Sequence, residues 1–164
     1  MEPTQSLHQW IDTAKKVFTF FDGFFLVAAY EGNFWIWPPS LSHYPCPAQL
    51  SQQKDSVALA LDQPSFFRIC HQSSMPYHGY VVPSPVHDRL YAYLKSQIPQ
   101  HVTILPILGA ESLVALLYME RKKVERLSDI PALASLELKW EPLAYQFSSL
   151  YRLKRTGIIS SVRS

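Results

Sequence analysis

The stretch VTILPILGAESLVALLYM, residues 102–119, decides the fold expected of this chain. Two nearly continuous apolar runs, residues 102–108 and 112–119, enclose the turn-forming tripeptide Gly109-Ala110-Glu111. Apolar runs separated by a turn are typical of paired antiparallel strands, and runs without polar alternation are typical of strands covered on both faces. These residues therefore predict a central hairpin at the heart of a sheet.

Amphipathic helices are predicted at both ends of the chain. A capping-box pattern opens the first, over about residues 6–21. Ser128 and Asp129 are expected to cap the last, whose apolar residues keep spacings of three and four. Pro142 lies within this helix and predicts a kink, because proline lacks the amide proton that a helix bonds. The apolar stripe of the last helix consists of Leu133, Leu136, Trp140, Leu143, Phe147 and Leu150.

The segment between these helices predicts further strands and short helices. A hairpin is expected around the turn Glu31-Gly32-Asn33, and Ser84 with Pro85 is a typical helix start. Residues 38–54 have the proline-rich composition of a surface loop. The expected strands cover residues 24–30, 34–37, 56–61 and 79–82; the expected middle helices open at Asp62 with Pro64 and at Ser84, the second burying Val86, Leu90, Leu94 and Ile98.

Length, charge and composition restrict the class of protein. The 164 residues suit one domain, which we assign to residues 1–153, with 154–164 as a flexible tail or linker. A formal net charge of +2 is too small to indicate nucleic-acid binding. Residues 17–39, the longest apolar stretch, are interrupted by charged residues and glycines, so we expect no transmembrane segment. The N-terminus lacks a secretory signal pattern, and a cytoplasmic α+β domain is expected.

The central hairpin resembles the signature of a known family. Residues 102–108, with Pro106-Ile107, and the run LVALLYME at 113–120 are similar to the "PI…G…vGlLYlD" pattern of GAF domains. The segments PSFF at 64–67 and YHGY at 77–80 look like a divergent bacterial branch of GAF-like domains. The resemblance implies an antiparallel sheet of five or six strands, with the terminal helices on one face and shorter helices on the other. It also implies a ligand cavity under the middle helices and pairing through the terminal helices.

Two cysteines, Cys46 and Cys70, are the candidate nucleophiles. Cys70-His71 resembles the pair that attaches the chromophore in bilin-binding GAF domains, but it lies one helix too early in the chain. Cys46 stands between two prolines, with no positive charge to lower the thiol pKa, which argues against a GAF-type reductase of free methionine sulfoxide. No GxSxG, GxGxxG, Walker A or HExxH motif occurs. We therefore predict no catalytic residue and no cofactor.

Polar and aromatic residues in the middle of the chain form the candidate ligand site. Arg68 and His71 share a helix face at spacing i, i+3, which suits an anion or a nucleotide phosphate. The histidines here lack the HxH and HxxxH spacings that place two imidazoles on one element, so no metal is expected. The candidate ligand-binding residues are Arg68, His71, Tyr77, His78 and Tyr80.

The terminal helices carry apolar residues outside a single apolar stripe. Trp10 and Val17 widen the face of the first, and Tyr145 and Tyr151 lie off the stripe of the last. These residues fit either a four-helix bundle with a second copy or one broader core. The favoured hypothesis is a non-catalytic regulatory module of bacterial signalling that binds a protein partner or forms a homodimer through these helices. The alternatives are a small-molecule receptor, for a nucleotide or metabolite, and the thiol reductase.

Overall fold

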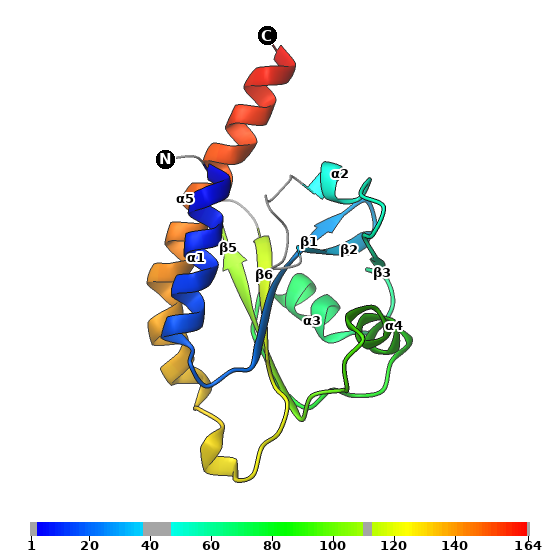
Figure 1. Cartoon of the computed structure of the whole chain (residues 1–164), viewed down its shortest axis with the longest axis vertical. Helices are drawn as coiled ribbons and strands as arrows, with labels where there is room; N and C mark the ends of the chain where they lie inside the picture. The colour runs from blue at the N-terminus through cyan, green and yellow to red at the C-terminus, as the bar shows by residue number, and fades with distance from the viewer. Residues whose placement is uncertain (1–2, 38–46, 110–112, 164) are drawn as a thin grey trace.

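A six-stranded antiparallel sheet with helices on both faces forms the protein (Figure 1). The computed structural model describes residues 3–37, 47–109 and 113–163. Its strands pair in the order β3-β2-β1-β6-β5-β4. The strands are β1 (Gly23–Tyr30), β2 (Asn33–Trp37), β3 (Ala58–Ala60), β4 (Tyr77–Gly79), β5 (His101–Leu108) and β6 (Leu113–Arg121). The helices are α1 (Pro3–Val17), α2 (Pro47–Leu50), α3 (Phe66–Ser73), α4 (Pro85–Leu94), the 3-10 turn η1 (Leu127–Asp129) and α5 (Leu133–Arg163).

The predicted central hairpin is confirmed. Strands β5 and β6 pair along their length, with Leu105 opposite Leu117 and Ile104 opposite Tyr118. Leu105 and Leu117 belong to the apolar cluster under α1 and α5, whereas Ile104 and Tyr118 belong to the cluster under α3 and α4. Because successive side chains of a strand point to opposite faces, each strand serves both cores, which explains its unbroken apolar sequence. The predicted α+β fold class is likewise confirmed.

The first hairpin is also present, with a tighter turn than predicted. Tyr30 pairs with Asn33, so only Glu31 and Gly32 lie in the turn. Both residues have positive φ, 48° and 77°, the backbone of the two-residue turn that matches the twist of paired strands. Asn33 is therefore the first residue of β2.

Several predicted boundaries were wrong, because hydrogen bonds of individual residues set them. Ser65, and not Asp62, caps α3 by accepting from the Arg68 amide. Helix α4 ends at Leu94, where Lys95 takes a left-handed conformation, and this leaves Ile98 exposed outside the helix. The predicted strand at 79–82 lies earlier, at β4, where Tyr77 pairs with Ile104.

The terminal helices differ from the prediction at their ends. Helix α1 ends at Val17 and not at residue 21, although Phe21 is buried as predicted from its spacing. Asp129 belongs to η1 and does not cap α5, which begins at Leu133. Helix α5 continues through Pro142, which is exposed, and its backbone stays helical through 154–163. Within the predicted loop 38–54, residues 38–46 lie outside the described residues and α2 occupies part of the rest.

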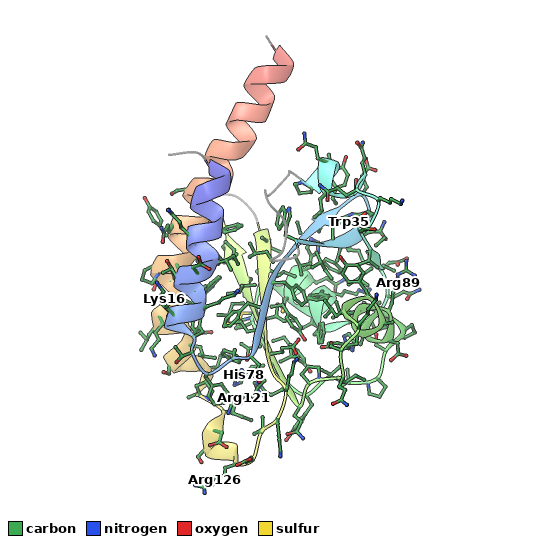
Figure 2. All side chains as sticks on the ribbon, viewed as in Figure 1. Lys16, Trp35, His78, Arg89, Arg121 and Arg126 are labelled. Atoms are coloured by element: carbon green, nitrogen blue, oxygen red, sulfur yellow. The ribbon has the colours of Figure 1, made fainter. Side chains whose placement is uncertain are left out.

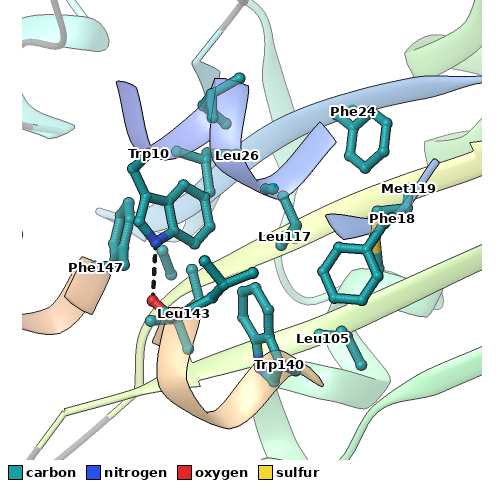
Figure 3. Close-up of a cluster of buried hydrophobic side chains, with 14 of the residues drawn as sticks. Trp10, Phe18, Phe24, Leu26, Leu105, Leu117, Met119, Trp140, Leu143 and Phe147 are labelled. Atoms are coloured by element: carbon teal, nitrogen blue, oxygen red, sulfur yellow. Dashed lines mark hydrogen bonds between the residues drawn. The ribbon is translucent and has the colours of Figure 1, made fainter. Parts of the chain in front are cut away.

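Aromatic rings of α1 and α5 pack against each other and against the sheet. Trp10 of α1 is 1% exposed and donates a hydrogen bond from Nε1 to the Leu143 carbonyl of α5, at 2.8 Å (Figure 3). Its ring meets Trp140 and Phe147 edge-on, with centroids 5.8 and 5.0 Å away. Edge-on pairs of buried aromatic rings stabilise a core by about 0.5–1.5 kcal/mol each beyond their area. The two ends of the chain are thus joined in one packed layer.

Candidate functional site

Aromatic side chains fill the space between the sheet and helix α3. Phe66 and Phe67 are 1% and 0% exposed, and their ring centroids lie 4.7 Å apart. Phe67 also packs against the rings of Phe34 and Tyr118. These rings occupy the place where the family resemblance implied a ligand cavity.

A buried hydrogen-bonded chain borders this cluster. The hydroxyl oxygens of Tyr91 and Tyr118 are 2.7 Å apart, and Tyr118 donates to Glu120 Oε1 at 3.0 Å. Burial raises the pKa of the Glu120 carboxyl. A Cβ at Gly23 would lie 2.9 Å from Glu120 Cγ, so the glycine leaves room for the buried side chain. The three polar groups satisfy one another inside the core. Sequence reasoning missed them because Tyr91 of α4 and Tyr118 of β6 meet only in the folded chain.

Two predicted ligand residues, Arg68 and His71, lie on helix α3. Arg68 is half-buried, and its backbone amide donates a hydrogen bond to Ser65 Oγ. His71 packs edge-on against the Phe34 ring, with centroids 5.7 Å apart. Their shared helix face is therefore used partly for packing.

The other three predicted ligand residues lie on β4 or directly after it, and they face different neighbours. Tyr77 donates its hydroxyl proton to the Tyr80 carbonyl, and the Tyr80 ring is 68% exposed. His78 lies 2.7 Å, through Nδ1, from Thr103 Oγ1 and edge-on to His101. The structure thus brings Tyr77 and Tyr80 together, but it places His78 in a different cluster.

An open hollow lies where the connections at the ends of β4, β5 and β6 meet. Its volume is about 470 Å³, which is within the range of small-molecule sites. One of the predicted ligand residues, Tyr80, lines it. The remaining lining residues are Val81, Pro99, Gln100, Val124, Glu125, Arg126 and Ile130.

His87 of α4, for which no role was predicted, contacts helix α3. His87 accepts the Phe66 amide proton at Nε2, 3.1 Å away, and lies 2.6 Å through Nδ1 from the Val82 carbonyl. Its ring stacks on Phe66 at 3.9 Å. These contacts make His87 a structural residue of the core. No cluster of three or more metal-ligating side chains occurs among the described residues.

The Cys70 thiol is buried and unsuited to nucleophilic chemistry. Its Sγ lies 3.9 Å from the Ile104 carbonyl, and burial raises its pKa to about 12. Because of this raised pKa, very little thiolate, the reactive form of cysteine, exists at neutral pH. Cys46, the other candidate nucleophile, lies outside the described residues.

We predict that Cys70 does not react with a disulfide reagent in the native protein. In a Cys46→Ser background, modification at pH 8 should be at least about 1,000-fold slower than in denaturant, because the thiolate fraction falls about tenfold for each unit of raised pKa. Absorbance of the released thiol measures the rate. Fast modification of the native chain would contradict this prediction and would make Cys70 a candidate nucleophile again.

The predicted interface residues have different surroundings. Trp10 offers no surface to a partner, because it is buried between α1 and α5, so the broader-core alternative holds for this residue. Val17 is half-buried against the same cluster. Tyr145 is 77% exposed, and Leu138, which was not predicted, is 80% exposed seven residues before it. The side chain of Tyr151 is outside the described part of the chain.

Solved structures share this arrangement of sheet and helices. The chain is similar to the GAF domain of a two-component sensor histidine kinase from Bacillus halodurans, with a TM-score of 0.59 and 15% identity, over 90% of this chain and 97% of that one. It is also similar to the A. aeolicus nlh2 GAF domain in an inactive state, with a TM-score of 0.54 and 10% identity, over 87% and 82% of the two chains. No protein-family model and no curated protein matches the sequence. The chain therefore has the GAF-like fold that its central hairpin predicted.

Proposed function

We propose that the chain is a non-catalytic regulatory module of a cytoplasmic bacterial signalling system, and that it acts by pairing through helix α5. The GAF-like fold supports a regulatory role, since the similar structures include a domain of a sensor histidine kinase. One observation carries the pairing: α5 keeps two large apolar side chains, Leu138 and Tyr145, almost fully exposed.

These side chains belong to a stripe along the outer side of α5. Leu138 and Tyr145 are seven residues apart and so lie on one helix face, with the exposed residues Ala134 and Pro142 in the same row. The opposite face of the helix packs into the core. Covering a leucine or a tyrosine contributes about 1.5–3 kcal/mol, so the outer stripe favours association. Among the described helices, none combines the length and apolarity needed to span a membrane.

The charges beside the stripe favour a second copy of the chain as the partner. Glu137 and Glu141 lie on one side of Leu138, and Lys139 lies on the other. In a parallel pair of helices, opposite flanks of the two copies face each other, which brings glutamate against lysine. We therefore favour a parallel homodimer, and association with a different protein is the competing outcome.

We predict that charge on the stripe disrupts pairing. Leu138→Glu and Tyr145→Glu should each raise the dimer dissociation constant by at least about tenfold, since each loses apolar burial of more than about 1.4 kcal/mol. Sedimentation analysis across a concentration series measures this constant. Both positions are exposed, so the melting temperature should change little.

The matched control is Ile69→Glu. Ile69 is 51% exposed on α3, on the other face of the sheet, and receives the same apolar-to-acidic change. The dimer dissociation constant of the Ile69→Glu variant should match that of the unsubstituted chain. A chain that is monomeric at all concentrations, or an equal effect of Ile69→Glu, would contradict pairing through α5.

A small-molecule receptor is the second candidate function. The hollow lined by Tyr80 supports it, because its volume suits a metabolite. Native mass spectrometry of the purified chain tests this alternative by the mass of a retained ligand. The same mass spectrum shows whether the chain is a monomer or a dimer.

A further inference from the structure

Three separate connections of the chain line the open hollow at the ends of β4, β5 and β6. Tyr80 follows β4, Pro99 precedes β5, and Arg126 belongs to the connection from β6 to α5. Figure 2 shows Arg126 on this connection, beyond the end of the sheet at which Arg121 lies. None of the described lining residues belongs to α3 or α4. The hollow is therefore separate from the space under α3 that aromatic rings fill.

One wall of the hollow is apolar and incompletely covered. The Tyr80 ring is 68% exposed, and Ile130 is half-buried. Val82 and Ile98, each next in sequence to a lining residue, are 54% and 55% exposed. Covering apolar surface removes it from water and is favourable, and aromatic rings pack well against one another. The wall therefore favours a ligand with an apolar group, and the exposed Tyr80 ring favours an aromatic one.

Two opposite charges line the same hollow, on Glu125 and Arg126. Both side chains are exposed, and within the described residues neither has a hydrogen-bond or ion-pair partner. The bond from Arg126 to Asp129 Oδ2, at 2.9 Å, comes from the backbone amide and leaves the guanidinium free. A guanidinium binds a carboxylate through two parallel hydrogen bonds, and a carboxylate accepts from an ammonium group. Because the two charges cancel, the hollow suits a zwitterion better than a simple anion or cation.

Hydrogen bonds hold the charged segment in place before any ligand binds. Gln100 Oε1 accepts the amide proton of Val124, the residue directly before Glu125, at 2.6 Å. The Gln100 amide donates to the carbonyl oxygens of Arg121 and Lys122, at 3.1 and 3.2 Å. Gln100 directly precedes β5, so these bonds join the start of the β6–α5 connection to the sheet. A site that is formed beforehand loses less free energy to ordering when a ligand binds.

We propose that the hollow binds a free amino acid with an aromatic side chain. The carboxylate of this ligand pairs with Arg126, its ammonium group pairs with Glu125, and its ring packs against Tyr80. The hollow's volume of about 470 Å³ is within the range of small-molecule sites. The assignment rests on the second candidate function, the small-molecule receptor, and names the ligand class of that receptor. It does not depend on pairing through α5.

An NMR titration of the 15N-labelled full chain with L-phenylalanine tests the assignment. The backbone amides of residues 80–81, 100, 124–126 and 130 should shift in a saturable manner, since these residues line the hollow. Two analogues isolate the charges, because 3-phenylpropionate lacks the ammonium group and phenethylamine lacks the carboxylate. Each analogue should bind at least about tenfold more weakly than L-phenylalanine, since each leaves one charged side chain without its partner.

Variants of the lining residues assign each contact. Arg126→Gln should weaken the binding of L-phenylalanine about tenfold without weakening that of phenethylamine, which has no carboxylate. Glu125→Gln should weaken the binding of L-phenylalanine about tenfold without weakening that of 3-phenylpropionate. Tyr80→Ala should weaken the binding of all three ligands, because they share the ring. Arg68→Gln is the matched control, since it removes the same charge from α3, outside the lining, and should leave the dissociation constant of L-phenylalanine unchanged.

Three results would overturn the assignment. If L-phenylalanine shifts none of these amides, the ligand class is wrong, and a ligand of another mass retained in native mass spectrometry would keep the receptor function alone. If one analogue binds as tightly as L-phenylalanine, the zwitterion is wrong, and the hollow is a receptor site for a singly charged ligand. If Arg68→Gln weakens binding as much as Arg126→Gln does, the carboxylate does not pair with Arg126.

Discussion

Replacing Trp10 with alanine is expected to lower the free energy of unfolding by about 3–5 kcal/mol, the usual cost of removing a large buried aromatic side chain. Trp10 is 1% exposed and contacts both Trp140 and Phe147 in α5. It also donates the hydrogen bond to the Leu143 carbonyl that joins the two terminal helices. The change therefore removes apolar burial and one connection between α1 and α5.

Urea denaturation followed by far-UV circular dichroism measures the loss. Trp10→Phe keeps an aromatic ring and loses the N–H donor, so it should cost less than Trp10→Ala. Gln9→Ala, at an exposed neighbouring position of the same helix, should change stability by less than about 0.5 kcal/mol. A Trp10→Ala variant that keeps full stability and loses only association would contradict this core role. It would support the interface role that the sequence pattern indicated for Trp10.

The fold was accessible from sequence because its signals are local. The unbroken apolar runs around Gly109 and the spacing of Leu136, Trp140 and Phe147 each predict an element without knowledge of its neighbours. Boundaries were less accessible, because they depend on single hydrogen bonds. Lys95 ends α4 through a left-handed backbone, although the apolar spacing continues to Ile98.

The candidate site was less accessible, because it depends on contacts between distant segments. His78 and His101 are 23 positions apart and meet only because β4 and β5 pair, with His78 opposite Thr103. Trp10 and Tyr145 both lie on apolar helix faces, yet one is buried and the other exposed. Apolar spacing identifies a face but not what covers it. For Leu138, the seven-residue spacing to Tyr145 was the one available signal.

Replacing Phe67 with alanine is expected to open the ligand space that this ring fills, at a cost of about 3–5 kcal/mol in the free energy of unfolding. Phe67 is 0% exposed and lies against the rings of Phe25, Phe34, Phe66 and Tyr118. A cavity lined by apolar side chains stays dry and binds small apolar molecules. Benzene should therefore raise the melting temperature of Phe67→Ala.

The response of the unsubstituted chain to benzene distinguishes a packed core from an existing receptor cavity under α3. With the rings packed as observed, benzene should leave its melting temperature unchanged, and Ile69→Ala, on the exposed side of the same helix, should behave alike. An equal rise in all three proteins would mean that apolar space already exists in the native core. In that case the receptor function under α3 gains support.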